Sequence, residues 1–233
     1  MPYDYLAVNT GSRTMGTFSC KGVWENALTT RPINYLLGKI ENKEKELIEK
    51  GITPRVVVCG AGCAGVELSM TFKQRWSELF GKEIEVAILT DGPTVLWHEK
   101  QALVEQINRK LAEKNVVVHA NCKATEITKD GVHTDDGRFV EGNVFVWSTG
   151  AEAQPVTQAS ELEMENRYFR VNDFMQSTSH PNVFCGGDCA CMASYAHEPY
   201  PPKAGVFAVR QGPIISQNIP RIMKGEELVK YVP

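Results

Sequence analysis

Three glycines spaced as G-x-G-x-x-G are the clearest chemical signal in the sequence: Gly60, Gly62 and Gly65. The valine-rich run 55–59 before them is typical of a buried strand, and residues 66–80 after them have a helical pattern. In that setting the first glycine permits a tight turn, the second lets a pyrophosphate approach the backbone, and the third lets helix and strand pack closely. The motif therefore predicts a dinucleotide site at the helix N-terminus. A tight turn without a ligand is the alternative.

The end of the next predicted strand, 85–89, should meet the adenosine ribose of such a dinucleotide. Thr90 and Asp91 follow this strand. Asp91 could accept hydrogen bonds from the ribose hydroxyls and would repel a 2′-phosphate, whereas Thr90 stands where the acid normally falls. No arginine follows this strand end, which favours NADH over NADPH.

Three more predicted strands are followed by small or acidic residues. Strand 5–8 precedes Thr10-Gly11, strand 143–147 precedes Ser148-Thr149-Gly150, and strand 183–185 precedes Gly186-Gly187-Asp188. A carboxylate beside a glycine pair can accept hydrogen bonds from sugar hydroxyls. Taken alone, Asp188 would more simply form a turn after a strand.

A last helix is expected over residues 203–223, opened by Pro201 and Pro202. Lys203, Phe207 and Gln211 fall on one face of it and could line a ligand, or Lys203 could belong to a core helix and reach out to solvent. An earlier helix is expected over residues 33–50. Its charges, from Glu41 to Lys50, are most simply explained as a solvated face.

Strands that alternate with helices predict an α/β fold, with a doubly wound parallel sheet. The net charge of −3 gives no reason to expect nucleic acid or an anionic membrane as a partner. Apolar runs are too short for a membrane span. The seven cysteines do not form the framework of a small secreted protein, which favours a reducing, cytoplasmic location; flanking sequence could place the protein in mitochondria or at a membrane surface.

The order of these motifs resembles the pyridine nucleotide-disulfide oxidoreductase superfamily, with its FAD- and NAD(P)-binding, glutathione-reductase-like fold. The resemblance implies a three-layer arrangement in which a Rossmann-like NAD(P) domain (29–150) is inserted between two segments of an FAD domain (1–28 and 151–233). It implies that the following residues bind the two cofactors, FAD and NAD(P)H: Gly11, Gly60, Gly62, Gly65, Glu67, Thr90, Asp91, Gly150, Gly187, Asp188, Lys203, Ala204, Gly205 and Val206. No catalytic side chain and no metal site is expected.

The function implied is that of an FAD-dependent NAD(P)H oxidoreductase acting on a quinone or another small acceptor. A plain NAD-dependent dehydrogenase and a non-catalytic accessory domain are the alternatives. Residues 177–189 and 203–213 look most like the NADH-dehydrogenase-like flavin domain fused ahead of selenide, water dikinase, followed by type II NADH dehydrogenases and apoptosis-inducing-factor-like reductases. A fused enzyme domain or a homodimer is conceivable.

The resemblance also implies a first FAD segment, with its own glycine loop, upstream of Tyr3. We therefore expect the FAD domain to be incomplete at its N-terminus, and this chain alone to hold FAD poorly and to be inactive. No Cys-x-x-Cys pair occurs, so a dithiol mechanism is not expected. Cys189 and Cys191 could have a redox role, although small residues packed under a cofactor are the simpler interpretation.

Overall fold

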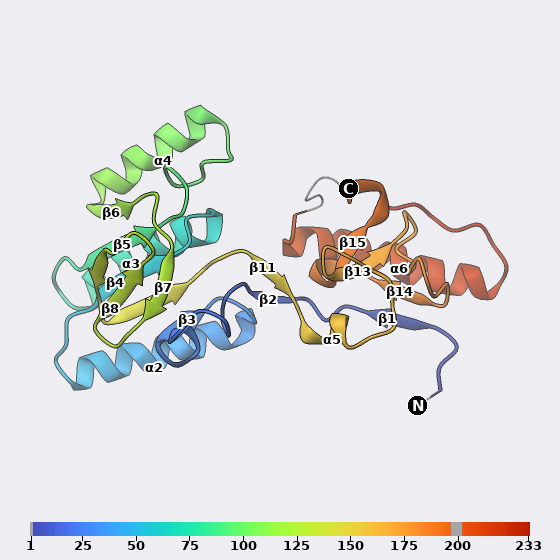
Figure 1. Ribbon diagram of the computed structural model, residues 1–233, viewed down its shortest axis with the longest axis horizontal. Helices are drawn as coiled ribbons and strands as arrows, with labels where there is room; N and C mark the ends of the chain where they lie inside the picture. Colours follow the sequence, from blue (N-terminus) through green and yellow to red (C-terminus); the bar gives the residue numbers. More distant parts are fainter. Residues whose placement is uncertain (1, 197–201) are drawn as a thin grey trace. The chain divides into compact units, whose positions relative to one another are not determined.

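The computed structural model describes residues 2–196 and 202–233 and divides the chain into two compact units (Figure 1). One unit combines Met1–Arg13 with Ala151–Pro233, and the other is the continuous segment Thr14–Gly150. The continuous unit thus begins 15 residues before position 29, where the sequence placed a boundary, because the elements at 23–29 pack within it. The assignment of the two units to FAD and NAD(P) stays a prediction.

A five-stranded parallel sheet forms the centre of the continuous unit. Its strands, in spatial order, are β3 (Ala27–Thr29), β10 (Val144–Trp147), β4 (Arg55–Cys59), β5 (Glu85–Leu89) and β6 (Val116–His119). From β4 the chain proceeds outward to β5 and β6, and it later returns to β10 on the other side of β4. The carboxyl end of β4 is therefore a topological switch point, where Rossmann folds bind nucleotides. The predicted α/β, Rossmann-like fold is confirmed.

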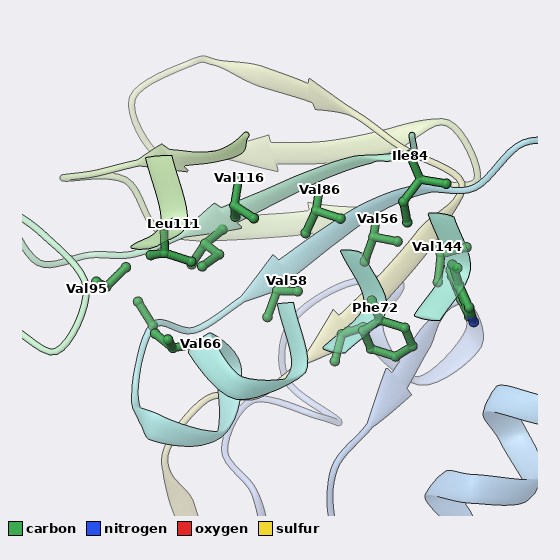
Figure 2. Close-up of a cluster of buried hydrophobic side chains, with 14 of the residues drawn as sticks. Val56, Val58, Val66, Phe72, Ile84, Val86, Val95, Leu111, Val116 and Val144 are labelled. Atoms are coloured by element: carbon green, nitrogen blue, oxygen red, sulfur yellow. The ribbon is translucent and has the colours of Figure 1, made fainter. Parts of the chain in front are cut away.

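Three helices cover one face of this sheet: α2 (Leu36–Glu49), α3 (Cys63–Leu79) and α4 (Gln101–Glu113). A short 3-10 turn, η1 (Ile33–Tyr35), leads into α2. Every second residue of the strands points to these helices, as Val56 and Val58 do in β4 (Figure 2). They pack with Phe72 and Trp76 of α3, and each fully buried side chain of this kind contributes about 1.5–3 kcal/mol.

The opposite face of the sheet carries the alternate residues, Val57 and Cys59 among them. It is covered by α1 (Val23–Asn26) and by an antiparallel meander of β7 (Ala124–Ile127), β8 (Gly131–Thr134) and β9 (Phe139–Glu141). The continuous unit therefore has three layers: helices, parallel sheet and meander.

The other unit is built around a parallel pair, β1 (Leu6–Val8) with β14 (Val183–Cys185). Its remaining elements are β11 (Ala151–Ala153), which pairs with β2 (Ser12–Thr14), then α5 (Pro155–Gln158), β12 (Met164–Glu165), β13 (Tyr168–Val171), the 3-10 turns η2 (Gly187–Cys189) and η3 (Ala193–Tyr195), β15 (Ala190–Met192), and α6 (Gly205–Met223). Phe169, Phe184 and Met175 are fully buried in its core, against which the α6 residue Ile215 packs.

Two helices begin at positions other than those the sequence predicted. α3 begins at Cys63 rather than at residue 66, because Gly62 already has the extended conformation of an N-cap (φ −72°, ψ 179°). α6 begins at Gly205, after an extended Ala204. Lys203 consequently lies before the helix and not on its face. Pro201, expected at this helix start, lies outside the described residues.

Candidate nucleotide-binding sites

The glycine loop after β4 has the geometry that its spacing predicts. A Cβ on Gly65 would lie 1.9 Å from the carbonyl oxygen of Gly60, so α3 could not pack here with any larger residue. Gly60 has a φ of +113°, and a Cβ on it would meet the Ser148 carbonyl oxygen at 2.3 Å. A Cβ on Gly62 would meet nothing within 4 Å. Two of the glycines are thus required by the fold, and the third leaves open space at the start of α3.

No side chain caps the N-terminus of α3. Gly62, Cys63 and Ala64 are exposed there, and Val66 is the first amide to bond back within the helix, to the carbonyl of Gly62. The preceding amides and the helix dipole make such an end suitable for an anion. Glu67, one turn further on, is also exposed.

The end of β5 lies against this loop, since the Gly60 amide donates to the Leu89 carbonyl at 2.9 Å. Thr90 is buried, and its hydroxyl accepts a hydrogen bond from the Gly92 amide at 3.1 Å. Asp91 is exposed. Of the two residues the sequence pointed to, Thr90 is engaged in holding the turn, and Asp91 presents its carboxylate to solvent.

The third strand end at the loop is that of β10. Ser148 donates its amide to the Cys59 carbonyl at 2.9 Å, and the following Thr149 hydroxyl donates to the carbonyl of Met15 at 2.5 Å. Gly150 is exposed. The structure therefore brings the residues predicted after β4, β5 and β10 to one edge of one sheet.

The second predicted site lies in the unit that contains β1 and β14. These strands are parallel neighbours, so Gly11 and Asp188 follow strand ends at the same edge. Ser12 is buried, and its hydroxyl donates to Asp188 Oδ2 at 2.8 Å although the two residues are 176 positions apart. Ser12 was missed by sequence reasoning, because nothing local marks a serine whose partner is so distant.

α6 packs on the Gly186-Gly187 turn beside Asp188. The Gly187 amide donates to Oε1 of Gln211, a buried residue of the helix, at 2.7 Å. At the exposed start of the helix, a Cβ on Gly205 would meet nothing within 4 Å, and Val206 is also exposed. Ala204, the N-cap, is half-buried.

The expectation that Lys203 shares a helix face with Phe207 and Gln211 is wrong. Its ammonium donates to the Ala190 carbonyl and lies 4.0 Å from the centre of the Tyr168 ring. Burial lowers the pKa of Lys203, and the nearby Cys191 and Asp188 oppose this effect. Lys203 thus connects the segment before α6 to β15 through a hydrogen bond and to β13 through a cation–π contact.

The seven cysteines, all within the described residues, form no disulfide. Burial raises the pKa of Cys185 to about 12 and also raises the pKa of the Cys191 thiol. The Cys189 thiol is fully buried and donates to the Gly186 carbonyl at 3.1 Å. Burial of this kind favours the packing interpretation of Cys189 and Cys191 over a reactive role.

Within residues 2–196 and 202–233, no group of three or more histidine, cysteine or acidic side chains is arranged to hold a metal ion. In the same part of the chain, no helix combines the length and the apolar character that crossing a membrane requires.

Comparison with known proteins supports the resemblance seen in the motifs. The chain is 29% identical over 226 residues to a probable NADH dehydrogenase of Dictyostelium discoideum, covering 88% of this chain and 49% of the relative. It is 26% identical over 236 residues to the type II NADH:quinone oxidoreductase of Haemophilus influenzae, covering 88% and 52%. The chain therefore spans about half the length of these relatives.

Solved structures share the fold. The water-forming NADH oxidase of Lactobacillus brevis, bound to NADH, superimposes with a TM-score of 0.77 at 21% identity over 99% of this chain and 48% of its own. The Plasmodium falciparum NDH2 in complex with NADH gives a TM-score of 0.70 at 20% identity, over 82% and 45%. The model of the pyridine nucleotide-disulphide oxidoreductase family matches residues 1–212, nearly the whole sequence. The chain belongs to the pyridine nucleotide-disulphide oxidoreductase family.

Proposed function

We propose that this chain is part of an FAD-dependent NAD(P)H oxidoreductase that transfers hydride from the nicotinamide to FAD and electrons onward to an acceptor. The observation that carries the proposal is the open space at Gly62, beside an uncapped helix N-terminus at the switch point of the parallel sheet. The chain supplies this nicotinamide site in one unit and part of a flavin site in the other.

In the continuous unit, the first amides of α3 would hold the pyrophosphate of NAD(P)H, and Gly62 would leave the space that it needs. The exposed Asp91 carboxylate would accept from the ribose hydroxyls and disfavour a 2′-phosphate, which makes NADH the favoured cofactor. Thr90 would contribute by fixing the turn that presents Asp91.

In the other unit, Asp188 would accept hydrogen bonds from the ribityl hydroxyls of FAD, with Ser12 orienting the carboxylate. Gly11 and Gly187 would let the backbone approach, and the start of α6 would lie by the ring. FAD, when bound, supplies the redox chemistry. Hydride transfer requires no acid or base from the protein, so we assign no catalytic side chain.

A quinone is the favoured acceptor, because relatives at 23–26% identity are named type II NADH:quinone oxidoreductases. The resemblance to the flavin domain associated with selenide, water dikinase stays a prediction, as do a fused partner and a homodimer.

The test is oxidation of NADH and of NADPH by the protein, expressed with whatever coding sequence precedes this chain in its gene and supplied with FAD. We expect turnover with an artificial electron acceptor and a preference for NADH of at least about tenfold (about 1.4 kcal/mol). Turnover without flavin would instead indicate a plain dehydrogenase, and nucleotide binding without turnover would indicate an accessory domain. A tenfold preference for NADPH would contradict the role given to Asp91.

A further inference from the structure

The side chain of Gln211 is enclosed by the protein although it is polar, with only 2% of its surface exposed. It projects from α6 toward the Gly186-Gly187 turn, where Oε1 accepts the Gly187 amide at 2.7 Å. A buried glutamine loses side-chain entropy, and its polar atoms lose water. The hydrogen bond to the Gly187 amide offsets part of this cost.

The Gly186-Gly187 turn that Gln211 contacts is closely packed on several sides. Gly187 has a φ of +68°, and a Cβ there would lie 2.6 Å from Asn9 Oδ1 and 3.1 Å from the Ala208 Cβ. The Gly186 amide donates to the Val8 carbonyl at 3.0 Å. The turn is therefore wedged between the end of β1 and α6, and Gln211 supplies the bond to its central amide.

The opposite end of the same side chain is not used by the protein. Among the described residues, Gln211 Nε2 has no hydrogen-bond partner. The atom is also not completely enclosed by protein, so a ligand can reach it. Because Oε1 is committed to the Gly187 amide, the orientation of the planar amide group is fixed. The Nε2 donor therefore remains available beside the turn that carries Asp188.

We propose that Gln211 is the positioning residue of the FAD site: Oε1 fixes the Gly187 peptide, so that Asp188 stays in register with Ser12, and Nε2 donates a hydrogen bond to bound FAD. This inference rests on the proposed function and extends it to a residue on α6. Ser12 holds the Asp188 carboxylate, and Gln211 holds the backbone next to it.

Three variants of the chain test the proposal. Gln211→Met keeps the length of the side chain but removes both the acceptor of the Gly187 amide and the Nε2 donor. Gln211→Glu keeps the acceptor for the Gly187 amide and loses the donor whenever the carboxyl group is ionised. Gln217→Met changes an exposed glutamine on the same helix and serves as the matched control.

The first measurement needs no ligand. We expect the Gly187 amide, followed by hydrogen–deuterium exchange, to exchange at least about tenfold faster in Gln211→Met than in the wild-type chain or in Gln217→Met, because its partner is lost. Unchanged exchange at Gly187, with the fold intact by circular dichroism, would overturn the positioning role.

The second measurement is a titration of each chain with FAD, read from the visible circular dichroism of the flavin. We expect Gln211→Met to bind FAD roughly tenfold more weakly than the control. Gln211→Glu should bind like wild type at acidic pH, where a protonated carboxyl group can donate, and more weakly as the pH rises. The wild-type chain should lack this pH dependence.

The outcomes separate the inference from the proposed function. Equal FAD affinity for wild type and Gln211→Met, or pH-independent binding by Gln211→Glu, would overturn the donor role and leave the flavin site standing. No FAD signal from the wild-type chain or the control at saturating FAD would overturn the proposed flavin site itself, and the donor role with it.

Discussion

The roles of the three glycines in the loop after β4 could be predicted from the sequence. The spacing predicted three distinct roles, and the structure gives a physical reason for each: Gly60 meets Ser148, Gly65 meets Gly60, and Gly62 faces open space. The sequence could predict this because all three roles are local to one strand–turn–helix unit. It could not predict the contact with the carbonyl of Ser148, because Ser148 follows β10, a strand that comes much later in the chain.

Gly62→Val should leave the fold intact and weaken the binding of NADH. The φ of Gly62, −72°, suits any residue, and a Cβ there contacts nothing, so the fold should tolerate valine at a cost of about 1 kcal/mol or less. The side chain would occupy the space proposed for the pyrophosphate. We expect at least a tenfold loss of NADH affinity, about 1.4 kcal/mol, by calorimetry.

Gly38→Val is the control for that experiment, since Gly38 is an exposed helix residue whose Cβ would also contact nothing. It should bind NADH like the wild-type chain. If Gly62→Val does the same, the assignment of this loop to the nicotinamide cofactor is wrong.

Helices and strands were predicted best where the pattern is strongly periodic. The strands 55–59, 85–89 and 183–185 have the predicted bounds. The helix starts were predicted less well, because an N-cap such as Ala204 is defined by backbone dihedrals that its side chain does not signal. The short elements α1 and β3 escaped detection, because three or four residues are too few to show a period.

The interpretation of the charges on α2 as a solvated face is wrong for one residue. Glu44 is 7% exposed, and its carboxylate accepts two hydrogen bonds from Arg75, at 2.7 and 2.9 Å, and one from Trp76 Nε1 at 2.5 Å. Trp76 is completely buried. Glu44 therefore joins α2 to α3, an arrangement that no spacing within α2 reveals.

We expect Glu44→Ala to lower the free energy of unfolding by about 2 kcal/mol, because the buried Trp76 N–H loses its acceptor. The Arg75 ion pair adds little to this, since Arg75 is largely exposed. Chemical denaturation followed by tryptophan fluorescence measures the change. Glu49→Ala, an exposed change on the same helix, should stay within about 0.5 kcal/mol of wild type.

The same contact should make stability depend on pH. The hydrogen bonds from Arg75 hold the pKa of Glu44 below its ordinary value of 4.5. The folded state then binds this proton less readily than the unfolded state. Ionised Glu44 therefore stabilises the fold fully above its ordinary pKa, and this stabilisation is lost as the pH falls through the lowered pKa of the folded state. The difference in free energy of unfolding between wild type and Glu44→Ala should therefore become smaller as the pH is lowered. A difference that does not change with pH would contradict this account.

At the scale of the whole chain, the order of the motifs carried more information than any one of them. Asp188 alone is typical of a turn, yet the strand before it, β14, pairs with β1 near the start of the sequence. The interruption of one compact unit by another follows from this pairing. Composition and periodicity could not supply it, because pairing between distant strands leaves no local signal.

This chain alone should hold FAD weakly. Within the unit that contains Asp188, the contacts proposed for FAD are the Asp188 carboxylate, the start of α6 and the Gln211 amide. Each contributes on the order of 1–3 kcal/mol. A large flexible ligand also has an ordering cost of several kcal/mol on binding. We therefore expect the chain to bind FAD measurably in a titration but to lose it on gel filtration, and to be colourless when purified.

Asp188→Ala should weaken FAD binding further, by roughly tenfold, because the ribityl hydroxyls would lose their acceptor. Its matched control is Asp173→Ala, an acidic residue of the same unit that bonds to Ser194 and Lys230 and lies outside the proposed site. If coding sequence precedes this chain in its gene, protein made with that sequence should be yellow and should lose its flavin on Asp188→Ala. Stoichiometric FAD retained by the 233-residue chain itself would show that the glycine loop at Gly60 binds the flavin, or that the assignment of the two units is wrong.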